Sequence, residues 1–506
     1  MRRRSVIRDT IQMTVIQFFL ECLALLFNAW MTRRVGAATV GTLALAGSFF
    51  NLAAMVAGGN AMLCASRFVS EELGKSCGCP AQILRNAVRF CLLSVPVSAG
   101  IFAFAEPLSR QFLQSTAMAQ AVRLMALLLP LGSISACLKG YFNAVCRVTV
   151  TAGCDVAEFL LRAGLLTGLL LWHRAAKPEQ VCTYLVGSMA AGTLFSTAVL
   201  LLLYVRKREP CRGKCSLSFG TYIRLAVPVA FGGCLTAALS TANDTLIPMT
   251  LRQFGDSTSR ALQQFGTFEG IVIPVLFFPS TILCALSGIL IPEVARANAA
   301  GNRERVCRLT ERVIELTLIF AVLISAVLLK YGGVIGRCMD GGELSGRMIR
   351  ILAPVVPFIY LEIVLEALIK GMGKQNFSSL NYLAEYVIRI CVVLICIPLF
   401  GFYGIVASYY TSNVFGNCNR LRMAVKTANL RFRFGKLIGK PVFAVGFAFA
   451  AASLPEHFCP QLRETPLGIA VFLGITLSLY GLVLRLLRER RDITRGVPVR
   501  AVSAAC

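Results

Sequence analysis

Long apolar runs recur from one end of this 506-residue chain to the other, and short segments between them hold most of its charge. A bilayer core needs about 20 apolar residues per helix, and the run at 11–31 meets that length. Charged residues make up 15% of the chain, against about 25% in an ordinary globular domain. Runs this long lack the alternation of an outer-membrane barrel, and chains this apolar do not stay disordered. The sequence therefore predicts an all-α polytopic membrane protein rather than a soluble enzyme.

The runs predict about 14 transmembrane helices, at 11–31, 38–62, 87–106, 120–138, 148–172, 182–204, 222–248, 270–292, 313–334, 348–369, 378–399, 402–419, 438–454 and 466–486. Basic clusters such as Arg206–Arg208 fall between alternate spans. The positive-inside rule then places both termini in the cytoplasm, and we expect a bacterial plasma membrane. The formal charge of +26 is explained by topology and by attraction to anionic membrane lipids, so nucleic acid is not an expected partner.

The 20 cysteines do not form a zinc-like pattern. Most lie inside apolar runs, where cysteine behaves as a small hydrophobic residue. Cys77 and Cys79 form an isolated C-x-C, and Cys211 and Cys215 have no partner pair at metal-site spacing. The sequence predicts no metal, no cofactor and no structural disulfide. It also contains no Walker loop and no nucleophile elbow, so we expect no catalytic residues and no ATP-driven transport within this chain.

Short motifs repeat in the same order along the chain. Leu63–Ala65 recurs at Leu283–Ala285, and Leu138–Gly140 recurs as Ile369–Gly371. Downstream of the second motif, an Ala-Glu is followed by an arginine four residues after the acid, in both copies. Six spans separate the copies, so the repeats have parallel orientation, as in transporters whose substrate lies between two halves. We predict six-helix lobes at 1–215 and 216–436, and an extra helix pair with a basic cytoplasmic tail at 437–506.

Ionisable side chains within membrane spans are candidates for function, because they normally face a cavity or a partner. They are Glu21, Asp155, Glu158, Arg162, Asp244, Glu362, Glu366, Glu385 and Arg389. Glu158 and Arg162 share a helix face at i,i+4, as do Glu385 and Arg389. Two interpretations stay open for these pairs. Each pair neutralises itself and locks helices together, or the pairs form charged walls of a central aqueous cavity.

Arginines also stand at the predicted outer ends of the first and seventh spans. Arg33 and Arg34 end the first, and Arg252 ends the seventh. Their position runs against the inside bias, and the planar guanidinium suits phosphate oxygens. The alternative is that each arginine extends to outer head groups. Asparagines such as Asn28 and Asn243 either bond a glycan or bond neighbouring helices.

These residues resemble a known family. Leu138-Lys-Gly-Tyr-Phe-Asn143, the acid and arginine of the following span, Asn243–Pro248 and Ile291–Ala295 are similar to the stage V sporulation protein B branch of polysaccharide exporters. That branch belongs to the multidrug/oligosaccharidyl-lipid/polysaccharide (MOP) superfamily, with the lipid II flippase MurJ and the MATE exporters. The resemblance covers about residues 8–490. It implies two six-helix lobes around a V-shaped cavity, alternating access, and in flippases an added helix pair. MurJ-type flippases place arginines within cavity-lining spans, whereas here Arg33, Arg34 and Arg252 lie at span ends.

The leading hypothesis is a flippase for an undecaprenyl-pyrophosphate-linked saccharide. Arg33, Arg34, Glu158, Arg162, Asp244, Arg252, Glu385 and Arg389 are the predicted substrate-binding residues. A second hypothesis is a MATE-like antiporter that exports cations in exchange for protons or sodium, with Glu21, Asp244 and Glu385 as coupling acids. A third is a membrane glycan polymerase or acyltransferase, which the short loops disfavour. A role in sporulation follows only from the family's name.

Overall fold

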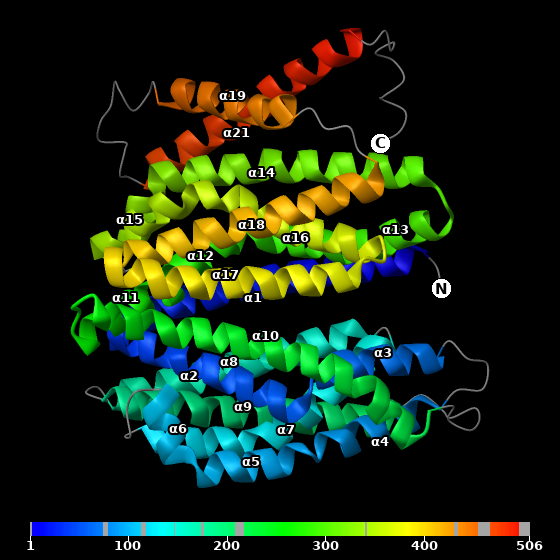
Figure 1. Ribbon diagram of the computed structural model, residues 1–506, viewed down its shortest axis with the longest axis vertical. Coiled ribbons are helices and arrows are strands. Elements are labelled where there is room, and N and C mark those ends of the chain that lie inside the picture. Colours follow the sequence, from blue (N-terminus) through cyan, green and yellow to red (C-terminus); the bar gives the residue numbers. More distant parts are fainter. Residues whose placement is uncertain are drawn as a thin grey trace. The chain divides into compact units, whose positions relative to one another are not determined.

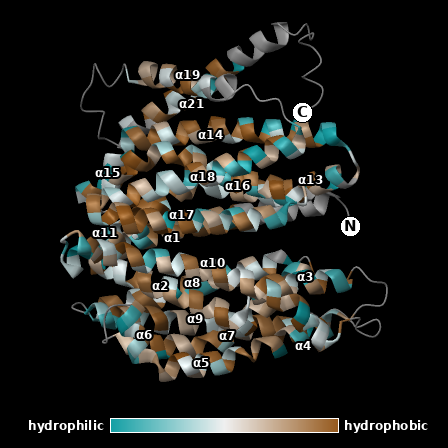
Figure 2. Ribbon diagram, viewed as in Figure 1, coloured by the Kyte–Doolittle hydropathy of each residue, from teal (hydrophilic) through white to brown (hydrophobic). Residues whose placement is uncertain are grey.

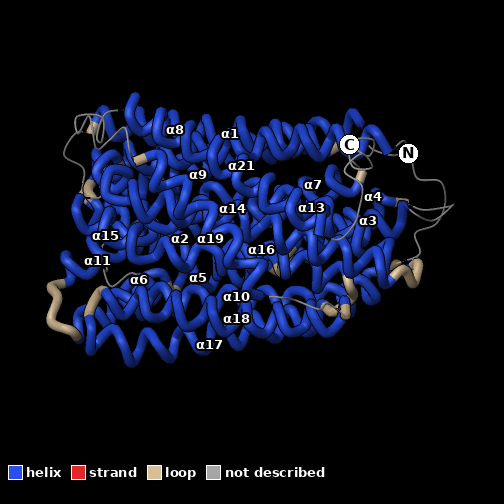
Figure 3. Tube along the Cα trace, turned by 90° about the horizontal axis from the view of Figure 1, so that it is seen from above, coloured by secondary structure: helices blue, strands red, loops and turns tan. Residues whose placement is uncertain are grey.

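The computed structural model describes residues 3–73, 79–112, 118–145, 147–173, 177–207, 217–339, 342–429, 434–453 and 466–494. The helices, in chain order, are α1 (Arg3–Val35), α2 (Ala37–Gly58), α3 (Ala61–Leu73), α4 (Pro80–Cys91), α5 (Ser94–Ala103), α6 (Ala105–Phe112), α7 (Ala119–Ala144), α8 (Val148–Trp172), α9 (Pro178–Lys207), α10 (Phe219–Gln253), α11 (Thr258–Thr267), η2 (Phe268–Val272), α12 (Ile273–Phe277), η3 (Phe278–Ser280), α13 (Thr281–Ala299), α14 (Arg303–Cys338), α15 (Gly342–Leu352), η4 (Ala353–Val355), α16 (Val356–Gly371), α17 (Gln375–Phe400), α18 (Tyr403–Ala428), α19 (Phe434–Ala452) and α21 (Pro466–Thr494). No strand occurs among these residues (Figure 3).

The all-α membrane fold predicted from the apolar runs is confirmed. Within the described ranges, ten helices or helix pairs are long and apolar enough to cross a membrane, and 439–452 and 471–485 are shorter apolar helices. In α14, apolar residues fill the middle of the helix and hydrophilic residues gather at its start (Figure 2). Because lipid offers no hydrogen bonds to the backbone, helices are the structure that such runs must adopt. The total of fourteen spans, the cytoplasmic termini and the division into lobes stay predictions.

The described residues form two compact units. Unit 1 comprises 1–285, 339–341 and 382–412, and unit 2 comprises 286–338, 342–381 and 413–506. Helices α13, α17 and α18 contribute residues to both. In unit 1, α7 packs against α3, α9, α5 and α2, and α10 packs along α2 (Figure 1). One buried cluster gathers Phe68, Tyr141, Phe142 and Tyr222 from α3, α7 and α10. The same cluster includes residues of α8 and α10, the helices that carry Glu158, Arg162, Asp244 and Arg252.

Unit 2 holds the helix pair that lies outside the repeat. Helices α19 and α21 pack on each other, and α19 packs against α14. Tyr480 Oη donates a 2.8 Å hydrogen bond to the Ile319 carbonyl, and the Lys330 ammonium lies 3.4 Å from the centre of the Phe472 ring. Tyr331 and Phe449 complete the aromatic surround of that lysine. An apolar seam and one aromatic-bound cation therefore hold the pair to α14.

The repeated Lys-Gly motif has the same structural purpose in both copies. A Cβ on Gly140 would collide with the backbone of α3 at Met62. A Cβ on Gly371 would collide with the Ile291 carbonyl and the Val294 side chain of α13. Small residues allow membrane helices to approach backbone to backbone. In both copies the glycine lies near the end of a helix and packs closely on the helix that carries the Leu-Cys-Ala motif, α3 for Gly140 and α13 for Gly371.

The eighth apolar segment lies in one long helical run, 258–298, whose regular α-turns are interrupted in the middle; we call this run the broken helix. After α11 the backbone passes through the π-turn η2, the short α12 and the 3₁₀ turn η3 before α13 resumes. Pro274 and Pro279 lie at the breaks. Proline removes a backbone donor and prevents a regular helix, and interrupted membrane helices line cavities in transporters. This break shapes the cavity described below.

One expectation about the cysteines was wrong. Cys79 is disulfide-bonded, whereas the sequence predicts no disulfide. Cys77, Cys211 and Cys215 lie outside the described residues. Thirteen other cysteines within the described ranges are free. Residue spacing alone gave no pairing signal, because the partner is set by how the chain folds.

Candidate functional site

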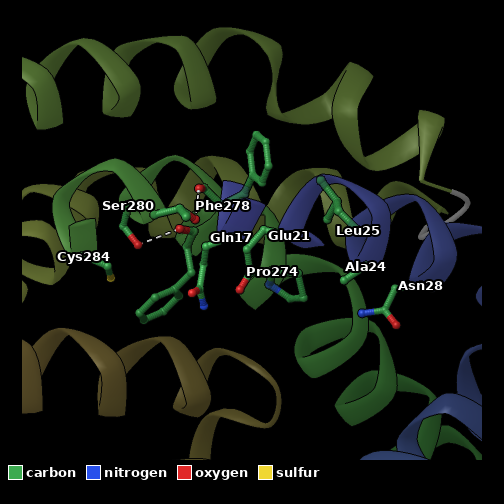
Figure 4. Close-up of a pocket in the computed structure, with 11 residues that line it drawn as sticks. Gln17, Glu21, Ala24, Leu25, Asn28, Pro274, Phe278, Ser280 and Cys284 are labelled. Atoms are coloured by element: carbon green, nitrogen blue, oxygen red, sulfur yellow. Dashed lines mark hydrogen bonds between the residues drawn. The ribbon is translucent and has the colours of Figure 1, made fainter. Parts of the chain in front are cut away.

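A cavity of about 330 Å³ lies between α1 and the broken helix, within unit 1 (Figure 4). From α1 it is lined by Gln17, Glu21, Ala24, Leu25 and Asn28; from α12, η3 and α13 it is lined by Pro274, Phe277, Phe278, Ser280, Thr281 and Cys284. The α1 residues recur at three- and four-residue intervals and so share one helix face. The polar ends of Gln17, Glu21 and Asn28 point to the same side of α1 (Figure 4). The cavity is at the small end of the ~300–1,000 Å³ range of small-molecule sites.

The hydroxyls of this cavity are already used as donors. Ser280 Oγ donates to the Phe277 carbonyl at 2.6 Å, and Thr281 Oγ1 donates to the Phe278 carbonyl at 2.8 Å. Both bonds satisfy carbonyls at the helix break, where regular backbone pairing is interrupted. Glu21 is exposed and forms no ion pair with any described residue. The sequence identified Glu21 as a carboxylate within a span, but its place in a cavity depends on the break in the opposite helix.

A second polar cluster lies within unit 1, around Asp244 of α10. Its carboxylate accepts hydrogen bonds from Ser48 Oγ of α2 and from Asn243 Nδ2, the latter at 3.1 Å. Glu269, in the π-turn η2, interacts electrostatically with Asp244 and with the Arg389 guanidinium. The cluster therefore joins charges from α10, η2 and α17. The sequence predicts Asp244 and Arg389 as site residues but places Glu269 at the end of an outer loop.

Arg389 is the positive centre of this cluster. Its Nε donates to Ser412 Oγ at 3.0 Å, and its Nη2 lies 3.5 Å from Glu385 Oε1. The guanidinium lies 4.6 Å from the centre of the Tyr409 ring and 5.3 Å from that of Tyr386. The predicted Glu385–Arg389 pair therefore exists, and it is almost fully buried. Its contacts favour the interpretation that this pair locks helices.

The corresponding pair in the first repeat is different. Glu158 Oε2 accepts a 2.9 Å bond from Lys139 Nζ, and Glu158 Oε1 accepts a 3.3 Å bond from Thr193 Oγ1. Lys139 also lies 2.8 Å from Asp155 Oδ1. Arg162, one turn beyond Glu158, instead lies over the Phe159 ring at 5.5 Å. Among the described residues Glu158 is therefore paired with Lys139 and not with Arg162, so the two repeats are not electrostatically equivalent.

The arginines at the span ends have separate environments. Arg34 Nη2 donates to the Leu170 carbonyl at the end of α8, at 3.1 Å, which ties α1 to α8. Arg33 is exposed. The Arg252 Nε is buried and has no hydrogen-bond partner within the described part of the chain. No hydrogen bond between described residues joins Arg34 to Arg252, and the assignment of Arg33, Arg34 and Arg252 to substrate stays a prediction.

A charged cluster in unit 2 was only half visible in the sequence. Arg420 of α18 is fully buried, and it contacts Glu362 at 3.1 Å and Glu366 at 3.4 Å, both on α16. Glu366 also accepts a bond from Ser378 Oγ and pairs with Lys370 at 3.1 Å. The two glutamates are recognisable as acids within a span. Arg420 is not, because it lies beyond the predicted end of the twelfth span at 419, whereas α18 continues to Ala428.

Comparison with known proteins places this architecture. Residues 6–297 match the family described as polysaccharide biosynthesis protein, and residues 269–397 match the MatE family. Stage V sporulation protein B of Bacillus subtilis (strain 168) is 20% identical over 99% of both chains. Sporulation protein YkvU of the same strain is 21% identical over 72% of this chain and 82% of its own length.

Solved structures share the fold. The lipid II flippase MurJ in an inward closed conformation has a TM-score of 0.63 at 14% identity, covering 96% of this chain and 100% of its own. The MATE multidrug transporter DinF-BH has a TM-score of 0.64 at 16% identity, covering 86% and 97%. The fold of this chain is therefore that of these membrane transporters. The family match at residues 6–297 extends over more than half of the chain, so the protein belongs to the polysaccharide biosynthesis protein family.

Proposed function

We propose that this protein is a flippase that moves an undecaprenyl-pyrophosphate-linked saccharide from the inner to the outer leaflet of the plasma membrane by alternating access. The observation that carries the proposal is the cavity between α1 and the broken helix, which Gln17, Glu21 and Asn28 line from α1, in a chain of the polysaccharide biosynthesis family. Carboxamide, carboxylate and hydroxyl groups at membrane depth can replace the water that hydrates a sugar. The lipid tail needs no such site, since it can stay in the bilayer.

The pyrophosphate needs a cation that is not already neutralised. Arg389 is held by Glu385, and Arg34 bonds to a backbone carbonyl. Arg162 contacts an aromatic face and is not ion-paired with Glu158, and Arg252 has an unsatisfied buried Nε among the described residues. An aromatic face leaves the guanidinium donors open to an anion. Arg162 and Arg252 are therefore the preferred phosphate ligands of the eight predicted site residues, with Arg33 as an outer contact.

The driving force must come from outside the chain's own chemistry, through a coupling ion or the membrane potential. Asp244, Glu158 and Glu385 remain proposed components of the translocation pathway. Asp244 and Glu385 share a cluster with Arg389, where movement of α10 against α17 would rearrange charges. We place both termini in the cytoplasm, where the basic tail faces anionic lipids. A role in sporulation would follow from the named relatives.

The experiment is translocation by the purified protein in vesicles. Vesicles contain fluorescent prenyl-pyrophosphate saccharide, and an impermeant reagent quenches only the outer leaflet. We expect the parent to move the lipid and Arg162→Lys to move it roughly tenfold more slowly, because lysine loses the two-point contact. Arg123→Lys, which changes an exposed arginine paired with Glu106, is the matched control. Parent protein that neither binds nor moves this lipid would refute the proposal.

One alternative uses the same cavity. Glu21, which has no basic partner among the described residues, lines the cavity together with Phe277 and Phe278. This combination would also suit the aromatic cation of a MATE-like antiporter coupled to protons or sodium. The MatE match at 269–397 begins in the broken helix. Efflux of an aromatic cation that is lost in Glu21→Gln, without any movement of the prenyl lipid, would select this function instead.

A further inference from the structure

We propose that the cavity between α1 and the broken helix is an acceptor-rich subsite for one sugar ring, selecting rings that present hydrogen-bond donors on adjacent carbons. The inference rests on the proposed function and names the part of the substrate that this cavity recognises. Those donors are either two hydroxyls or a hydroxyl beside a protonated amine, and the experiment below separates the two.

The hydrogen-bonding state of the cavity gives the selectivity. The Ser280 and Thr281 hydroxyls donate hydrogen bonds to the carbonyls of Phe277 and Phe278, respectively. Each hydroxyl can therefore only accept a further hydrogen bond. The Glu21 carboxylate, when ionised, is an acceptor with no donor of its own. The Gln17 and Asn28 carboxamides offer the strong donors, and the Cys284 thiol offers a weak one. A ligand that fits must therefore bring more donors than acceptors to the α13 side of the cavity.

The charge of Glu21 strengthens this selectivity. It lies within a predicted membrane span and faces the cavity, with no ion-pair partner among the described residues. Carboxylates at membrane depth are retained where a partner or an aqueous cavity compensates them. Two donors on adjacent ring carbons match the spacing of two carboxylate oxygens, and bonds to a charged acceptor are about twice as strong as neutral ones.

The size and apolar lining favour a single ring. A volume of about 330 Å³ is too small for a long oligosaccharide and a prenyl chain together. Phe277 is 39% exposed, so an aromatic face is available for the C–H side of a sugar. Leu25 and Pro274 close the rest of the wall. The cavity therefore binds one ring of the saccharide, while the remainder of the saccharide stays outside the cavity.

Cys284 provides a direct measure of occupancy, because it lines the cavity and is exposed. The rate of its alkylation is followed by mass spectrometry of the complete purified chain, and the exposed Cys391 of α17 is the internal control. The probes are methyl glucoside, its 2,3-di-O-methyl derivative, methyl 2-amino-2-deoxyglucoside and tetramethylammonium. We expect methyl glucoside and the amino glycoside to slow alkylation at Cys284 and not at Cys391. The di-O-methyl derivative, which keeps the ring but loses two donors, should not protect.

Glu21→Gln should weaken this protection by about tenfold, since it exchanges a charged acceptor for a neutral one. Glu179→Gln, which changes a partly exposed acid at the start of α9 outside the cavity, is the matched control and should behave as the parent. Stronger protection by the amino glycoside than by methyl glucoside identifies the ammonium as the preferred donor, and equal protection identifies the hydroxyls.

Protection that survives O-methylation or Glu21→Gln, or that no glycoside provides, overturns the subsite. Equal protection by tetramethylammonium also overturns it, since it indicates a general cation site. These outcomes are separable from the proposed function. Lipid translocation without sugar protection of Cys284 refutes the subsite alone, whereas sugar protection without lipid translocation refutes the flippase and leaves the subsite.

Discussion

Lys139→Met tests whether Lys139, rather than Arg162, compensates the carboxylates of α8. Lys139 Nζ contacts Asp155 at 2.8 Å and Glu158 at 2.9 Å, and methionine keeps the apolar stem while removing the charge. We expect the variant to fold less stably than the parent, because both carboxylates lose their cation within a membrane helix pair.

The magnitude follows from the exposure of the three groups. Bonds to charged groups contribute about 1.5–3 kcal/mol each when buried. Here the side chains are 18% exposed for Lys139, 25% for Glu158 and 43% for Asp155, so solvent screens much of that value, most of all for Asp155. The expected loss is about 2 kcal/mol. For a chain of this size, that corresponds to a fall of a few degrees in the thermal midpoint.

The assay is the thermal midpoint of detergent-purified protein, followed by the fraction that remains monodisperse after heating. A double-mutant cycle with Glu158→Gln measures the pair directly, because the double variant should regain part of the loss. Arg162→Leu is the control and should change the midpoint little. A stable Lys139→Met with an unstable Arg162→Leu would refute the pairing and restore the Glu158–Arg162 pair predicted from spacing.

Further predictions concern packing, topology and the outer arginines. Gly41→Ala should destabilise the protein by about 3 kcal/mol in a thermal assay, because the added Cβ would collide with the α11 backbone at Leu262. Gly47→Ala is the control and should be neutral, since the space around Gly47 is open. Equal effects of the two substitutions would contradict the close α2–α11 contact. Lys330→Met should loosen α19 and α21 and speed their proteolysis, since it removes the cation over Phe472; unchanged cleavage would exclude that role. Reporter groups at Lys177 and Ser257 should label from outside the cell, and labelling of Ser257 from inside would remove the parallel repeat. The triple variant Arg33→Lys, Arg34→Lys, Arg252→Lys should impair translocation at normal expression; transport equal to the parent would leave these arginines as head-group anchors only.

The class of the protein follows from its amino-acid sequence. Apolar runs of membrane length leave the backbone no hydrogen-bonding partner except itself, so the helices follow directly from composition. The repeated Lys-Gly motif was also visible in the sequence, and Gly140 and Gly371 each lie in a close helix contact that leaves no room for a Cβ. The family could also be recognised from short motifs in the sequence, and residues 6–297 match it. Site candidates such as Asp244 and Glu385 were found because ionisable groups within apolar runs are conspicuous.

Which charged groups pair with each other depends on the tertiary structure. Spacing paired Glu158 with Arg162 on one helix, but Lys139 comes from α7 and reaches Glu158 across a helix contact that no local pattern encodes. Glu269 looked like a loop residue until the π-turn placed it beside Asp244 and Arg389. The cavity, too, depends on tertiary structure, because its lining comes from α1 and from the irregular middle of the helix opposite. Helix formation depends on neighbours in sequence, whereas a partner or a cavity depends on which faces meet, and packing sets that.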